Sequence, residues 1–162
     1  MEVSMSVFKA WHDGTAGDPL SRAFAEALAA GKRGEVPIGA VVVREGEIIA
    51  AAGNRTRADR DPTAHAELLA IRAAALRLGS ERLLGCDLYI TLEPCAMCAG
   101  AISFARLRRL YYAAPDPKGG AVDHGPRFFA QPTCHHAPEV YGGLREGEAA
   151  DLLRRFFAER RD

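Results

Sequence analysis

The sequence shows no excess of charge of either sign, because Lys plus Arg and Asp plus Glu each number 21. This balance argues against a protein that coats nucleic acid through charge alone, although a local basic patch is still compatible with it. The sequence also lacks an apolar run of about 18 residues, so it predicts no transmembrane helix. Its first residues do not follow the basic-then-apolar order of a secretory signal. We therefore expect a soluble, cytoplasmic protein.

Cysteine is scarce as well, and two of the residues lie close together in the sequence. The four cysteines are Cys86, Cys95, Cys98 and Cys134. In a cytoplasmic chain of this size, a close pair favours metal or redox chemistry over a framework of disulfides. Hydrophobic residues make up 48% of the 162 residues, which is enough for a buried core. We predict a loose N-terminal arm over residues 1–19 and a single domain over residues 20–162.

The hydrophobic pattern predicts helices and strands in mixed order. The helices are expected at residues 20–31, 62–78, 95–105 and 148–160, and the strands at residues 38–43, 48–52, 87–91 and 107–112. The last two strands, with the helix between them, are typical of a parallel crossover unit. Residues 113–137 are rich in Pro and Gly and predict a long irregular loop, which in a compact domain is often functional. The elements together predict an α/β fold, with a mixed sheet covered by helices.

Two short motifs carry the chemistry: His65-x-Glu67, and Pro94-Cys95-x-x-Cys98. Two cysteines three residues apart at a helix start can face one point, and the positive end of the helix favours their thiolate form. His65, at the start of another helix, supplies a third ligand. One imidazole and two thiolates suit tetrahedral zinc, and the fourth position remains open for water, as in catalytic sites.

Glu67 is interpreted as a general acid and base rather than as a ligand. On an ideal helix it would point away from His65, but both side chains can lean around the helix end if they lie in the first turn. The carboxylate would take a proton from zinc-bound water and deliver it to the substrate. Taken alone, the two cysteines could equally be a redox pair, His65 a structural histidine and Glu67 a solvated residue. The joint pattern favours a zinc deaminase that acts on a nucleobase.

At these residues the chain resembles the bacterial tRNA-specific adenosine deaminases of the cytidine deaminase-like superfamily. The similarity runs over residues 20–161, and it is carried by residues 35–41, 53–55, 61–67 and 91–102. The resemblance implies conversion of the wobble adenosine to inosine in an arginine tRNA, one zinc ion per chain and a homodimer. It also implies a three-layer α/β/α fold with a mixed five-stranded sheet.

By position, the resemblance implies that His65, Cys95 and Cys98 bind zinc and that Glu67 shuttles the proton. Asn54 matches an asparagine that contacts the flipped base, although alone it would be interpreted as an ordinary turn residue. Asp116 and Lys118 fall in a loop near the substrate, where Lys118 could equally be solvated. The final helix matches one that contacts the anticodon loop, through Phe156, Phe157 and Arg160. At least one of these two aromatic residues is expected to seal the core instead.

Two alternatives remain open at this point. One is a free nucleobase or nucleoside deaminase acting on guanine or cytosine, and the other is a zinc-stabilised RNA-binding module without catalysis. The arginine-rich final helix and a cluster of Arg106, Arg108 and Arg109 favour RNA. Residues 119–133 depart from the expected pattern, and so does the run Cys134-His135-His136, for which a second metal site is the less favoured interpretation.

Overall fold

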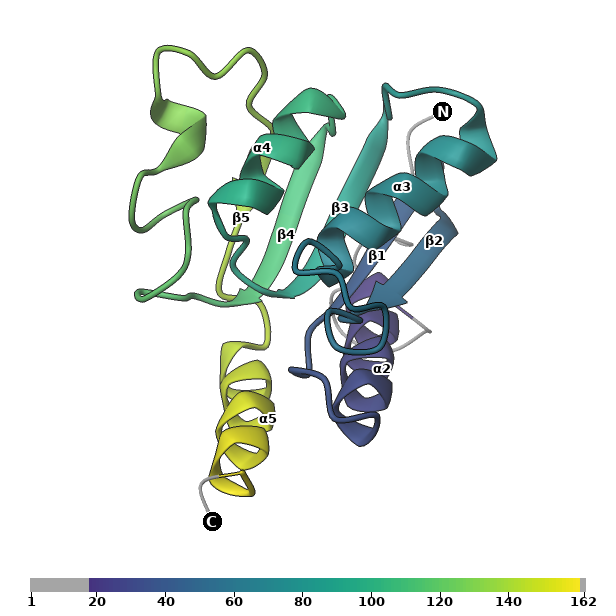
Figure 1. The fold of residues 1–162 in the computed structure, drawn as a ribbon. Coiled ribbons are helices and arrows are strands. Elements are labelled where there is room, and N and C mark those ends of the chain that lie inside the picture. Colours follow the sequence, from purple (N-terminus) through teal and green to yellow (C-terminus); the bar gives the residue numbers. More distant parts are fainter. Residues whose placement is uncertain (1–17, 161–162) are drawn as a thin grey trace.

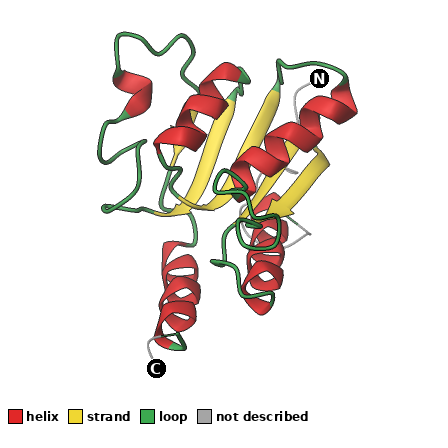
Figure 2. Ribbon diagram, viewed as in Figure 1, coloured by secondary structure: helices red, strands yellow, loops and turns green. Residues whose placement is uncertain are grey.

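A computed structural model describes residues 18–160, and these residues build one five-stranded sheet with helices on both faces (Figures 1 and 2). The strands are β1 (Gly39–Arg44), β2 (Glu47–Gly53), β3 (Cys86–Leu92), β4 (Arg109–Ala114) and β5 (Glu139–Tyr141). The helices are α2 (Pro19–Lys32), α3 (Ala66–Leu78), α4 (Ala96–Phe104) and α5 (Glu146–Ala158), with a short 3-10 turn η1 (Phe128–Ala130). Most of the expected arm lies outside the described residues.

The order of strands across the sheet is β2-β1-β3-β4-β5. β1 runs antiparallel to β2 and β3, whereas β3, β4 and β5 are parallel. The predicted mixed sheet is therefore confirmed, and α4 is the crossover helix between the parallel strands β3 and β4. The described helices include none that is long and apolar enough to cross a membrane.

Each strand divides its side chains between two hydrophobic clusters, because neighbouring residues of a strand point to opposite faces. Val42 and Leu88 pack with α3 and α4 on one face, while Val41 and Tyr89 pack with α2 and α5 on the other. The three-layer α/β/α arrangement is thus confirmed. Close contact of α2 with β1 depends on Gly39, where a Cβ atom would lie 1.9 Å from a backbone oxygen of the helix.

Two local features differ from the expectation. The helix predicted from residue 62 begins only at Ala66, because the Asp61 carboxylate accepts hydrogen bonds from the backbone N–H and the hydroxyl of Thr63 and holds a turn before it. The resemblance implied five strands, as observed, but the hydrophobic pattern placed only four of them and gave no position for β5. It has only three residues, and Val140 is the single aliphatic residue among them. This is too short for an alternating pattern to be recognised.

Candidate active site

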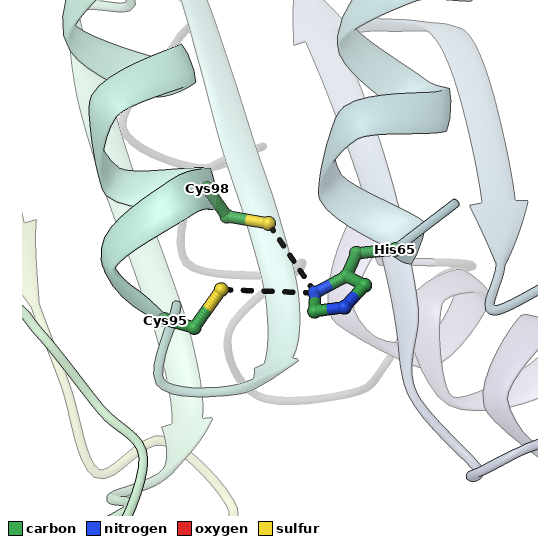
Figure 3. Close-up of side chains that lie close together, drawn as sticks. All are labelled: His65, Cys95 and Cys98. Carbon is green, nitrogen blue, oxygen red and sulfur yellow. Dashed lines mark hydrogen bonds between the residues drawn. The ribbon is translucent and has the colours of Figure 1, made fainter. Parts of the chain in front are cut away.

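His65, Cys95 and Cys98 converge at one point between α3 and α4 (Figure 3). The Nδ1 atom of His65 lies 3.7 Å from the sulfur of Cys95 and 3.6 Å from the sulfur of Cys98. His65 is half-buried, as is Cys95, and Cys98 is fully buried. Residues thirty positions apart in the sequence therefore present three ligand atoms to a single small volume.

The ends of two helices bring the three side chains together. His65 is the N-cap of α3 and Cys95 the N-cap of α4, both with extended backbone, while Cys98 lies in the first turn of α4. The two helices lie on the same face of the sheet and begin at the same end of it (Figure 1). Their N-terminal backbone N–H groups favour negative charge at this point, which stabilises thiolates.

The arrangement fits a zinc ion. Bonds of about 2.0–2.3 Å to nitrogen and sulfur place tetrahedral ligands about 3.5 Å apart, close to the separations between His65 and each sulfur. The hydrogen bond from Cys98 lowers the pKa of Cys95 to about 5. The same contact, together with burial, raises the pKa of Cys98. The contact between the two sulfurs thus favours a thiolate at Cys95, and a cation bound between them would favour the thiolate form of both.

Glu67 lies beside these ligands in the first turn of α3 and is only 4% exposed. Burial raises the pKa of its carboxyl group. Its Oε1 atom is buried without a hydrogen-bond partner in the described part of the chain. Because buried polar atoms normally have partners, an orphaned carboxylate oxygen next to three ligands indicates a place for water or substrate. On a continuous helix Glu67 would point away from His65. Because His65 is the extended N-cap before α3, this helical relation does not apply to the two residues.

Asn54 belongs to the same site. Its side-chain oxygen accepts a hydrogen bond of 2.9 Å from the backbone N–H of Ala66, the residue between His65 and Glu67. It is buried, and its backbone oxygen accepts a hydrogen bond from Arg33. With the oxygen engaged, the orientation of the amide is fixed and its NH2 group remains as the donor.

The residues expected to recognise RNA occupy a neighbouring region. Asp116 and Phe157 line one groove of about 420 Å³, between the ends of β3 and β4 and the helix α5. Phe157 is 46% exposed, while Phe156 is buried and has the guanidinium of Arg160 3.5 Å from its ring centroid. The expectation that one of the two aromatic residues seals the core is confirmed. Lys118 is exposed in a turn capped by the Asp116 carboxylate.

Two of the three clustered arginines, Arg108 and Arg109, are held in ion pairs away from the metal-binding cluster. Arg108 forms an ion pair with Asp87 at 2.8 Å, and Arg109 forms one with Glu139 at 3.0 Å. Arg109 begins β4, whereas Cys95 follows the end of the parallel strand β3, so the two lie at opposite ends of the sheet. These arginines are therefore neutralised and remote from the metal ligands.

The run Cys134-His135-His136 has a structural explanation. The sulfur of Cys134 lies 3.6 Å from the hydroxyl of Ser103 in α4, and a ring nitrogen of His136 lies 2.7 Å from the backbone oxygen of Leu107. Among the described residues, the group with metal-ligand spacing is the one formed by His65, Cys95 and Cys98.

Two buried carboxylates near the site were missed by the sequence reasoning. Glu35, 1% exposed, accepts hydrogen bonds from the backbone of Arg57 and Ala58, which lie in the loop after Asn54. Glu93, 2% exposed, accepts hydrogen bonds from the loop after β4. Burial opposes ionisation of Glu93, but the backbone N–H groups and the His124 ring outweigh it, and the pKa of Glu93 lies below its ordinary value. The signal in the sequence that could have pointed to Glu93 is its position directly before Pro94 and Cys95.

Comparison with known proteins adds three findings. The family model of the cytidine and deoxycytidylate deaminase zinc-binding region matches residues 17–114. A tRNA-specific adenosine deaminase of Agrobacterium fabrum is 66% identical over 142 residues, which cover 88% of this chain and 93% of that protein. A solved structure from work on A-to-I editing by tRNA:A34 deaminases at the wobble position has a TM-score of 0.82 and 64% identity, over 83% of this chain and 98% of that one.

A guanine deaminase of Bacillus subtilis is more distant. Its structure has a TM-score of 0.61 and 35% identity, and the match covers 89% of this chain and 92% of that one. The same fold thus occurs in relatives named as tRNA adenosine deaminases and as a guanine deaminase.

Proposed function

Since the chain belongs to the tRNA-specific adenosine deaminases, within the zinc-binding cytidine and deoxycytidylate deaminase family, we propose that it converts adenosine to inosine at the wobble position of a tRNA anticodon. The observation that carries the proposal is the orphaned oxygen of Glu67 beside His65, Cys95 and Cys98. A zinc site that served only to stabilise the fold would have no use for a buried carboxylate without a partner.

The reaction adds water to the adenine ring and releases ammonia, so the exocyclic amine becomes a carbonyl oxygen. When bound, the zinc ion acts as a Lewis acid and lowers the pKa of water at its open position, so that attack is possible at neutral pH. Glu67 accepts the proton that the attacking water gives up, at Oε1. The same oxygen delivers this first proton to the ring nitrogen, where it remains. Glu67 then takes the second proton, from the hydroxyl group now bound to the ring carbon, and delivers it to the amine. The C–N bond breaks, ammonia leaves and the carbonyl forms.

Asn54 is proposed to orient the base. Because Ala66 donates to its oxygen, the free NH2 group can donate to an acceptor nitrogen of a purine, such as N7. The hydrogen bond also ties this donor to the helix start that carries His65 and Glu67. Base orientation and metal position are therefore set by the same short segment.

The groove that contains Asp116 and Phe157 is proposed to receive the anticodon loop next to the flipped adenosine. Phe157 offers an exposed aromatic ring in the groove on which a base can stack. Arg160 and Lys118, which are exposed, offer positive charge for phosphates. Phe156 would contribute indirectly, by supporting Arg160. An anticodon nucleotide is already unpaired, so flipping it costs less than in a duplex. We propose an arginine tRNA as the substrate and the cytoplasm as the place of action.

A homodimer is proposed through the outer face of α4. Phe104 is 75% exposed and Met97 is 37% exposed, seven residues apart on one side of the helix. An exposed apolar stripe of this kind is typical of an interface rather than of a free surface. Sedimentation of the wild type as a dimer, and of Phe104→Asp as a monomer, is the expected result. A monomeric wild type would refute this part of the proposal.

The experiment that tests the function compares RNA with free bases. Zinc-loaded protein is incubated with an arginine anticodon stem-loop that has adenosine at the wobble position, and in parallel with guanine and with cytosine. We expect inosine at the wobble position, detected by sequencing, and no ammonia from the free bases. A stem-loop with guanosine at that position is the matched control. Ammonia from guanine without inosine in the RNA would favour the activity of the more distant relative.

A further inference from the structure

The side chain of Glu93 has no exposed surface, and both of its oxygens are fully engaged by one loop. Its Oε1 atom accepts a hydrogen bond of 3.1 Å from a backbone N–H and lies 2.7 Å from the Nδ1 atom of His124. Its Oε2 atom accepts three further backbone hydrogen bonds of 3.1–3.2 Å. The four backbone donors belong to Asp116, Val122, Asp123 and His124. A side chain at the end of β3 thus organises a loop that follows β4.

The same turn presents a metal ligand. Glu93 directly precedes Pro94 and Cys95, and the backbone oxygen of Pro94 accepts a hydrogen bond of 2.9 Å from Ala121. The backbone N–H of Glu93 donates to Ala114 at 2.8 Å. The side chain and backbone of Glu93 and the backbone of Pro94 therefore hold both ends of the loop.

The loop lies so close to the carboxylate that one position has no room for a side chain. A Cβ atom at Gly120 would lie 2.4 Å from the Oε2 atom of Glu93 and 2.5 Å from the backbone oxygen of Asp116. Any other residue here would push the loop away from Glu93. Gly147, in contrast, has nothing within 4 Å of an added Cβ atom.

From these contacts we propose that Glu93 is a positioning residue, which fixes the loop of residues 116–124 against the turn that carries Cys95 and thereby sets the substrate-facing wall of the site. The loop contains Asp116, whose backbone N–H is held by Glu93 and whose side chain lines the groove shared with Phe157. Glu93 acts through this loop and not on the reacting atoms. The inference rests on the proposed function, because it assigns this wall to substrate recognition.

The test is the steady-state kinetics of Glu93→Gln with the anticodon stem-loop. The amide keeps the size of the side chain but places an NH2 group against N–H donors. We expect KM to rise about tenfold, equivalent to about 1.4 kcal/mol, with kcat changed by less than about threefold and zinc retained at one ion per chain. Hydrogen–deuterium exchange of the amides of residues 116 and 122–124 should become faster. An unchanged KM, or a loss of kcat alone, would overturn the inference.

Gly120→Ala leaves the carboxylate intact and displaces the loop, so the same rise in KM is expected. Gly147→Ala is the matched control and should leave both kinetic constants unchanged. If both Glu93→Gln and Gly120→Ala behave like the control, Glu93 has no positioning role. If the wild type deaminates a free base and not the RNA, the proposed function fails, and the KM of the two variants for that base decides the inference.

Discussion

A buried glutamate lies at the start of α3 and another at the end of β3, each near a residue of the metal-binding cluster. The hydrogen bonding of the two carboxylates is opposite. Glu67, two residues after His65, has an oxygen without a partner in the described structure. Glu93, two residues before Cys95, has both oxygens filled by one loop. Burial raises the pKa of Glu67, whereas hydrogen bonds keep the pKa of Glu93 low despite burial. The comparison is between a carboxylate with one unpartnered oxygen, for which we propose a role in the chemistry, and one with both oxygens engaged, for which we propose a role in positioning the loop.

The largest effect is expected where the metal itself is lost. Cys95→Ala removes a thiolate ligand, and we expect zinc content to fall from one ion per chain to almost none, with deamination below detection. Elemental analysis after dialysis measures the metal, and sequencing of treated RNA measures the activity. Cys134→Ser is the control, since Cys134 lies outside the cluster. Zinc retained in Cys95→Ala would show that Cys95 is not a ligand, and the comparison of the two glutamates would lose its basis.

Replacing Glu67 or Glu93 by glutamine should lower the free energy of unfolding by different amounts. Glu93→Gln leaves several backbone N–H groups without an ionic acceptor, and we expect the free energy of unfolding to fall by about 3 kcal/mol. Glu67→Gln alters only the contacts of the carboxyl group with Cys98 and with a backbone N–H, and Oε1 has no hydrogen bond to lose, so a change of less than about 1 kcal/mol is expected. Chemical denaturation of the zinc-loaded variants measures both. Equal losses would contradict the distinction drawn between the two residues.

Glu35 offers an intermediate case. Burial opposes its ionisation, but hydrogen bonds from Ala58, Arg57 and Thr56 outweigh burial, and the pKa of Glu35 lies below its usual 4.5. A group whose pKa is lower in the folded state stabilises the fold at any pH above its pKa in the unfolded chain. This stabilisation is lost as the pH falls through the lowered pKa of the folded state. Glu35→Gln should therefore cost about 1–2 kcal/mol at pH 7 and clearly less near pH 3. A cost independent of pH would contradict the ionic role.

The smallest effect is expected for a carboxylate at the surface. Glu26 forms an ion pair of 2.9 Å with Arg22 on α2, and the Arg22 side chain is 52% exposed. Ion pairs of this kind contribute about 0.5 kcal/mol or less, because water and salt screen them. Glu26→Gln should lower the free energy of unfolding by no more than this amount, and the loss should vanish at high salt. A loss as large as that of Glu93→Gln would show that burial is not what distinguishes the carboxylates.

The sequence predicted those parts of the molecule in which local spacing determines the geometry. Two cysteines three residues apart and a histidine at a helix start were sufficient for the metal site, because helix ends fix their directions. The layered sheet followed from alternating apolar residues. Strand β5 was missed because three residues carry no pattern, and the role of Glu93 was missed because its partners lie 23–31 positions away in an irregular loop. Contacts of that range leave no periodic signal.

The most direct test of the account is the zinc content and the turnover of Glu67→Ala, measured on the same preparation. We predict one zinc ion per chain, as in the wild type, and a rate of inosine formation that falls by about 10²–10⁴-fold, the usual contribution of a general acid and base. Zinc content and rate both equal to those of the wild type would contradict the proton shuttle. Loss of the metal would instead make Glu67 part of the ligand set.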